Sequence, residues 1–301
     1  MPNVWSHILF GQRALKRAGF SVPVNPKAFN FGCQGPDFLL YHNFYPWKWD
    51  SRVSNLGNAI HKRHCGPFLL DLIQAGLQHV DMREYIQGFV THHILDRWTH
   101  PYIIYRSGDG KYKHQELEII IDTILALRLE KIRTWKEPVT PHINLGKQLP
   151  RSWVRVMEHT ARKHFPREAG SIKGRDWQRA YRHMLHALRL FFDPYGIKFI
   201  LTMGAIRPFR YKKPNPSVDY LNESLHAWVH PALPQERHRE SFWSLWEKAL
   251  KEADSILRTV QACWQGENQW TLLKQQIGNL SYDTGKDCDT NLLNKACDPI
   301  V

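Results

Sequence analysis

Residues 92–118 read HHILDRWTHPYIIYRSGDGKYKHQELE. In this stretch His92, Asp96 and His100 recur at intervals of four, and His114 and Glu118 repeat the same interval. Residues four apart lie on one face of an α-helix, one turn above the other. Imidazole nitrogens and carboxylate oxygens are ligands that zinc accepts. The stretch therefore predicts two helical segments, each of which presents a stripe of metal ligands.

Helix geometry divides these ligands between metal sites. With a rise of about 1.5 Å per residue, His92 and His100 are expected about 12 Å apart along the helix axis. Zn–N bonds are about 2.0–2.1 Å long, so both imidazoles cannot easily bind one ion. Asp96 lies midway and can reach either way. The spacing predicts at least two metals with a carboxylate between them, an arrangement that hydrolyses phosphate esters through a metal-activated water.

The remaining sequence favours an all-α fold, because no sustained run alternates apolar and polar residues as a strand would. Apolar periodicity predicts helices at 6–18, 37–41, 54–64, 69–79, 84–99, 115–131, 176–192 and 241–263, and two short helices within 132–175. Residues 20–36, rich in Pro, Asn and Gly, are interpreted as a loop. We expect a metal-binding helical catalytic core at 1–131, a helical extension packed on it at 132–278, and a polar tail at 279–301 that frays.

Charge and composition narrow the classes of partner and compartment. The formal net charge is +13, which favours anionic partners: phosphate-ester substrates, either phospholipid or nucleotide-like, and peripheral contact with an anionic membrane. No apolar run approaches the length of a membrane span, and the first residues do not read as a signal peptide. The five cysteines form no CxxC pair. A cytoplasmic location with free thiols is expected.

Four segments carry a family resemblance: FNFGCQGPDF (29–38), HKRHCGPFLLDL (61–72), THHILDRWTHPYI (91–103) and KHQELEIIIDT (113–123). Together they resemble the zinc-dependent phospholipase C family, which is related to single-strand-specific zinc nucleases, and in particular its intracellular, uncharacterised branch. By motif the resemblance covers roughly residues 1–130. It implies an all-α, multi-helix globule with a multinuclear zinc site between helices.

The resemblance also implies which residues bind metal. The first zinc would take Asp37, His61, His92 and Asp96, the second His100, His114 and Glu118, and the third Asp96 again together with His7. In secreted relatives a free terminal amine, usually on Trp, completes the third site. Here Trp5 is internal, and removal of the initiator Met would place the amine on Pro2. We therefore expect two to three Zn²⁺ per chain, while iron or manganese also accept these ligands.

Two residue assignments remain open at this point. His61 and His64 compete for one ligand position, and His61 is preferred because it follows Ala59-Ile60 and so adjoins an apolar face. The aromatic loop at 41–49, YHNFYPWKW, is best interpreted as core packing. A pocket wall, a lipid-facing patch or a base-stacking surface are its alternatives.

The function implied is a zinc-dependent phosphoric ester hydrolase, a phospholipase C-like phosphodiesterase that uses a metal-activated water. The resemblance assigns Asp37 a catalytic role as general base in addition to its role as a ligand. Nuclease or phosphatase activity on the same metal cluster is one alternative. A non-catalytic helical protein stapled by zinc is the other, although structural zinc sites are often rich in Cys and these ligands are His, Asp and Glu.

Overall fold

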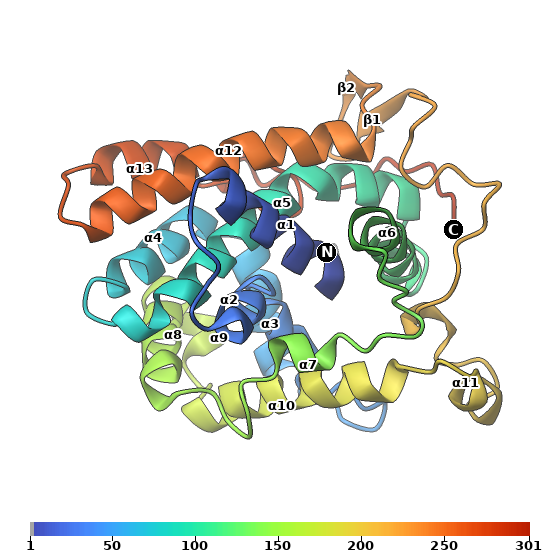
Figure 1. Cartoon of the computed structure of the whole chain (residues 1–301), viewed down its shortest axis with the longest axis horizontal. Helices are drawn as coiled ribbons and strands as arrows, with labels where there is room; N and C mark the ends of the chain where they lie inside the picture. The colour runs from blue at the N-terminus through green and yellow to red at the C-terminus, as the bar shows by residue number, and fades with distance from the viewer. Residues whose placement is uncertain (1–2) are drawn as a thin grey trace.

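The computed structural model describes residues 3–301 and is helical apart from one short hairpin (Figure 1). This confirms the all-α expectation. Its helices are α1 (Val4–Arg17), α2 (Pro26–Gly32), α3 (Arg52–Lys62), α4 (Cys65–Ala75), α5 (Arg83–Ser107), α6 (Lys113–Glu130), α7 (Thr140–Ile143), α8 (Arg151–His164), α9 (Pro166–Ala169), α10 (Gly174–Phe191), α11 (Ile197–Leu201), α12 (Phe242–Trp264) and α13 (Trp270–Ile277). Short 3₁₀ turns are η1 (Asp37–Tyr41), η2 (Val80–Met82), η3 (Arg207–Phe209) and η4 (Cys288–Thr290), and the strands are β1 (Trp228–His230) and β2 (Leu233–His238).

Helix α5 is the central element of the fold. Of its 25 residues 19 are buried, so it has no solvent-facing stripe and must be surrounded by other helices. It packs against α1, α2, α4, α6 and α12, which enclose it in Figure 1. The helix continues through Pro101 to Ser107, beyond the end expected at residue 99. The polar residues that α5 carries, including the first metal stripe, are therefore held inside the protein.

Helix α2 approaches α5 so closely that two glycines are required at the crossing. A Cβ on Gly32 would lie 2.0 Å from the Tyr85 carbonyl oxygen, and one on Gly88 would lie 2.3 Å from the Phe29 carbonyl oxygen. This helix lies in a region expected to be a loop. The Asn25 side chain caps its first turn and Pro26 occupies its first position, a combination that starts helices.

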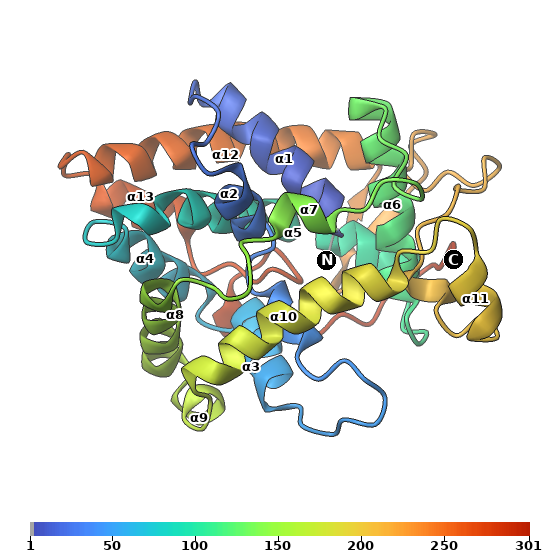
Figure 2. The same ribbon diagram turned by 60° about the horizontal axis from the view of Figure 1, so that its bottom comes forward.

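The other helices form layers on either side of α5. Helix α12 packs on α5 and α1 and pairs with α13 along one side, while α10 crosses the opposite side and contacts α3, α8 and η1 (Figures 1 and 2). β1 and β2 form an antiparallel hairpin that contacts the end of α5. Within residues 3–301, no helix has the length and apolar content needed to cross a bilayer.

The aromatic loop at 41–49 is not the core element that its composition suggested. Trp49 is 90% exposed and Trp47 is 66% exposed. Phe44 and Tyr45 contact the rings of His183 and His186 on α10, which holds the loop on the outside of that helix. Core packing was therefore wrong for both tryptophans, and they remain available to a partner.

Candidate metal centre

A first group of candidate ligands joins three separate elements. Asp37 begins η1, His61 lies in the last turn of α3, and His92 lies in the middle of α5; all three are buried. Asp37 Oδ1 lies 3.0 Å from His61 Nε2 and 3.6 Å from His92 Nε2. The three ligand atoms lie within 4.8 Å of one another. We call this group the Asp37 cluster.

The backbone determines which imidazole nitrogen faces each carboxylate. His61 Nδ1 donates to the Gly57 carbonyl at 2.7 Å, and His92 Nδ1 donates to the Cys33 carbonyl at 3.0 Å. Since a carbonyl can only accept, the proton of each neutral ring resides on Nδ1 and the lone pair on Nε2. That lone pair then faces the carboxylate of Asp37, which is also an acceptor. Two acceptors this close are stable only with a proton or a metal cation between them; with a proton, His61 donates to Asp37 as an imidazolium.

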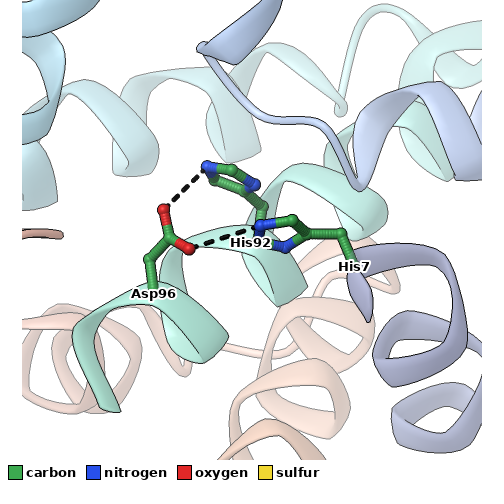
Figure 3. Close-up of side chains that lie close together, drawn as sticks. All are labelled: His7, His92 and Asp96. Carbon is green, nitrogen blue, oxygen red and sulfur yellow. Dashed lines mark ion pairs between the residues drawn. The ribbon is translucent and has the colours of Figure 1, made fainter. Parts of the chain in front are cut away.

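A second group, the His7 cluster, consists of His7 on α1 with His92 and Asp96 on α5. Figure 3 shows the two carboxylate oxygens of Asp96 turned toward two imidazoles. Oδ1 lies 3.3 Å from His7 Nε2 and Oδ2 lies 3.1 Å from His92 Nε2, while the two rings stack at 4.1 Å between centroids. Neither oxygen of Asp96 has a hydrogen-bond donor among the described residues.

A third group, the Glu118 cluster, consists of His100 on α5 with His114 and Glu118 near the start of α6. His114 Nε2 lies 2.7 Å and His100 Nε2 lies 3.8 Å from Glu118 Oε1. His100 Nδ1 donates to the Tyr282 carbonyl at 2.9 Å, so its Nε2 lone pair also faces a carboxylate. The His114 side chain is 27% exposed, whereas those of His100 and Glu118 are buried. This cluster therefore adjoins the protein surface.

Asp96 connects the three clusters. Its Oδ1 is 3.3 Å from His7 Nε2 and 3.7 Å from His100 Nε2, and its Oδ2 is 3.1 Å from His92 Nε2. All eight residues expected as ligands thus come together in three adjoining groups, with His92 and His100 in different ones. The arrangement matches the donor set of a multinuclear zinc site in residue type and in ligand-to-ligand spacing. Their assignment as ligands stays a prediction.

The two other histidines of the motif regions lie apart from the clusters. His64 is exposed and precedes α4 in a left-handed backbone conformation, where its ring approaches His164 and Phe165. His93 lies about 100° around α5 from His92, and its Nε2 donates to the Leu280 carbonyl at 2.9 Å. The geometry thus favours His61 over His64. The proposed amine of Pro2 lies outside the described residues.

Residues 279–290 do not fray as expected; they pack over the clusters. Leu280 and Tyr282 provide the carbonyls that bind His93 and His100, and Tyr282 N donates to the His61 carbonyl at 3.0 Å. The buried Tyr282 ring packs against those of His61, His92 and His93. This segment therefore orients the imidazoles that face the carboxylates.

Asp122 is a further buried residue of the site that sequence reasoning missed. It accepts hydrogen bonds from Trp5 N at 3.0 Å, Ser6 N at 2.7 Å and Tyr211 Oη at 2.7 Å. These bonds fix the first turn of α1 and thereby place His7. Burial raises the pKa of Asp122 to about 6. Asp122 follows Glu118 at the same interval of four that separates His114 from Glu118. This spacing could have indicated that Asp122 lies on the same face of α6.

Burial and neighbouring charged groups shift the pKa values of the buried residues in opposite directions. Burial alone would raise the pKa of Asp96, but the surrounding imidazoles His100, His92 and His7 hold it well below its usual value. Burial lowers the pKa of His100 and of His93 well below the ordinary imidazole range. For His61 burial also acts downward, but hydrogen bonding to Asp37 outweighs it and raises the pKa. Only a protonated imidazole lowers the pKa of a carboxylate by its charge, whereas burial disfavours that protonation. A bound cation would keep Asp96 ionised while the imidazoles stay neutral, the state that binds metal.

We expect the metal-free protein to lose stability as the pH falls through about 6.5. His93 and His100 have lowered pKa values when folded, so the unfolded chain binds more protons in this range and unfolding becomes more favourable. His61, whose pKa is raised, acts in the opposite direction, but it is one group against His7, His93, His100 and His114, whose pKa values are all lowered. Urea unfolding followed across this range measures the effect.

The matched variant is His93→Gln, which keeps a donor for the Leu280 carbonyl but does not titrate. It should show a shallower pH dependence than the wild-type chain. A urea midpoint that rises as the pH falls from neutral would contradict this prediction.

A comparison with family models matches residues 6–169 to the zinc-dependent phospholipase C model. The chain belongs to the zinc-dependent phospholipase C family. Searches of curated proteins and of solved structures found no match. The matched range contains all eight candidate metal ligands of this family member. Residues 279–290, which supply carbonyls to His93 and His100, lie beyond the matched range.

Proposed function

We propose that this protein is a zinc-dependent phosphodiesterase with phospholipase C-like activity. One observation carries the proposal. The Nδ1 atoms of His61, His92 and His100 donate hydrogen bonds to backbone carbonyls, so their Nε2 atoms are directed at buried carboxylates. Where the imidazoles are neutral, acceptors face acceptors in a water-poor interior, and a metal cation between them stabilises the arrangement. Membership of a zinc-dependent family supports zinc as that cation.

We infer two to three zinc ions per chain. The Asp37 and Glu118 clusters share no residue, so each provides a separate site. The His7 cluster shares His92 with the Asp37 cluster, and its Asp96 also lies near His100 of the Glu118 cluster. Metal binding there therefore depends most on the other two sites. None of the eight candidate ligands is Cys, which favours catalytic over structural sites.

When bound, zinc would acidify a water molecule and polarise a phosphoryl oxygen. The chain itself would hold and orient the reactants. Asp37 lies at the partly accessible edge of its cluster with a 10% exposed side chain, where it would accept the proton of the attacking water. The half-buried His114 marks the side from which a phosphodiester would enter. No side-chain nucleophile is needed for this reaction class.

The test is hydrolysis by zinc-loaded protein of phosphatidylcholine in mixed micelles, a single-stranded oligonucleotide and p-nitrophenyl phosphate. We expect release of water-soluble phosphorus from the phospholipid. Cleavage of only the oligonucleotide or only the monoester would replace the proposal with the nuclease or phosphatase alternative. Bound zinc without hydrolysis of any substrate would leave a zinc-stapled helical protein.

A pair of neighbouring histidines provides the matched control. His61→Ala removes a buried imidazole that faces Asp37, whereas His64→Ala removes an exposed imidazole three residues later. We expect His61→Ala to lose about 100-fold or more in kcat/KM and His64→Ala to keep activity within about twofold. Equal losses in the two variants would contradict the assignment of His61.

A further inference from the structure

The short helix α11 exposes an apolar surface. Four of its five residues are apolar, and none of the five is buried. Ile200, Leu201 and the following Met203 are among the most exposed apolar side chains of the described chain, with Met203 96% exposed. Figures 1 and 2 both show α11 projecting from the side of the molecule, beyond the end of α10. We call residues 195–203 the α11 tip.

The α11 tip is firmly attached to the rest of the protein. Asp193 accepts hydrogen bonds from Lys198 N at 3.1 Å and Phe199 N at 3.0 Å, which fastens the start of the helix. Lys198 Nζ donates to the last carbonyls of α10, those of Arg189 and Phe192. The Arg210 guanidinium lies over the Phe199 ring. A fastened helix therefore presents the apolar side chains, which is characteristic of a binding surface.

Basic residues surround this apolar surface. Residues 189–213 contain six Lys and Arg but only one acidic residue, Asp193, which pairs with Arg210. Glu116 of α6 pairs with Lys212 and, at 3.7 Å, with the largely exposed Arg207. Arg207 and Lys213 are exposed at the base of the tip. A second copy of the chain would bring two such basic segments together and is disfavoured. Exposed aliphatic side chains within a basic rim match an anionic lipid surface, which offers hydrocarbon below a layer of phosphate.

The aromatic loop is anchored at the same end of α10 as the α11 tip. Phe44 of the loop contacts Phe191 at the end of α10, and Phe191 stacks on Phe209 just beyond the tip. The exposed Trp47 and Trp49 thus lie on a loop anchored to the same end of α10 as α11. Tryptophan is enriched at the interface between lipid and water. Two independent segments therefore present residues suited to a bilayer.

The segment after the α11 tip contacts the start of α6, where the partly exposed His114 lies. Phe209 packs on Tyr112, at 4.9 Å between ring centroids, and Tyr112 directly precedes α6 and its His114. Lys212 donates to Glu116 at 2.8 Å in the same first turn of α6. The segment that follows the α11 tip thus contacts the start of α6, which carries His114, the most exposed of the candidate ligands.

We propose that the α11 tip, together with Trp47 and Trp49, docks the protein on an anionic lipid bilayer. Ile200, Leu201 and Met203 enter the interfacial region, and the exposed Arg189, Arg207 and Lys213 contact lipid phosphates. Docking itself does not depend on hydrolysis. Its role in delivering phospholipid to the Glu118 cluster rests on the proposed function.

Co-sedimentation with vesicles tests the docking surface. The full chain is mixed with phosphatidylcholine vesicles that contain or lack phosphatidylserine. We expect binding to the anionic vesicles that weakens with added salt and falls about tenfold or more in the triple variant Ile200→Ser/Leu201→Ser/Met203→Ser. The control is Val22→Ser/Val24→Ser, which removes two equally exposed apolar side chains from the distant loop after α1 and should leave binding unchanged.

Three outcomes would overturn the proposal. The first is wild-type protein that does not bind anionic vesicles, and the second is equal binding by the triple variant. A tip that instead mediates self-association would show as a concentration-dependent mass without vesicle binding, and also overturns it. Hydrolysis of a soluble short-chain phosphodiester distinguishes failure of the docking proposal from failure of the proposed phosphodiesterase function. Vesicle binding without any hydrolysis supports docking and contradicts the proposed function, whereas a triple variant that cleaves only the soluble substrate supports both.

Discussion

Asp96→Asn is expected to remove at least one zinc ion per chain and to lower phosphodiester hydrolysis about 100-fold or more. The asparagine keeps the size of the side chain but replaces one acceptor oxygen by an amide donor and removes the negative charge. Asp96 lies within 3.7 Å of His7, His92 and His100, so the loss affects all three clusters. Metal content by inductively coupled plasma mass spectrometry and hydrolysis of the preferred substrate measure the two effects.

Asp254→Asn is the matched control. It makes the same chemical change on α12, where the carboxylate pairs with Arg258 on the surface. We expect wild-type metal content and rate from this variant. Circular dichroism distinguishes a folded, metal-poor Asp96→Asn protein from an unfolded one. If folded Asp96→Asn retained all its zinc, the central position of this carboxylate in the metal centre would be disproved.

Chelation of the metals is expected to lower the melting temperature by about 10 °C. A ligand present at about 1,000 times its Kd stabilises a folded protein by about 4 kcal/mol, and each kcal/mol corresponds to about 2–4 °C for a chain of this size class. Without cations, the buried Asp96 carboxylate faces imidazole lone pairs and has no hydrogen-bond donor among the described residues. Differential scanning calorimetry with and without chelator measures the shift.

Adding zinc back should restore the original melting temperature, and Asp96→Asn should respond less to chelation than the wild-type chain does. His64→Ala serves as the control, because it removes an exposed imidazole outside the clusters and should respond fully. A melting temperature that is insensitive to chelator would mean that the buried charges are stabilised without metal.

The two stripes of candidate ligands could be anticipated because they depend on local periodicity, whereas Asp37, His61 and His7 were expected only from the family resemblance. His92, Asp96 and His100 face one way on any α-helix, whatever surrounds it. His114 and Glu118 follow the same rule on α6. Likewise, the apolar spacing of 241–263 is enough to predict α12 within a residue of its observed ends. These features require no knowledge of distant parts of the chain.

The contribution of residues 279–290 could not be anticipated, because it is made largely by the backbone. The carbonyls of Leu280 and Tyr282 orient His93 and His100, yet every residue has a carbonyl and none is marked by its side chain. The segment is polar in composition, which favours a solvent-exposed tail. Only the tertiary fold reveals where its acceptors lie.

Helix α2 and the aromatic loop were misread for different reasons. Asn25 and Pro26 together signal a helix start, but the surrounding Pro, Asn and Gly are also typical of loops. Trp47 and Trp49 are large and apolar and most often pack inside, so composition alone favours burial. Their exposure depends on the anchoring of the loop by His183 and His186 on α10, more than 130 residues later.

The closing position of residues 279–290 also has a consequence during synthesis. All eight candidate ligands lie between His7 and Glu118 and emerge early from the ribosome. At about 5–20 residues per second, roughly 10–30 s pass before Tyr282 is made. Through that interval the nascent chain carries the side chains of the site while His100 lacks its carbonyl acceptor. Metal taken up early therefore meets an imidazole whose orientation is not yet set, and the centre matures only once this late segment has docked.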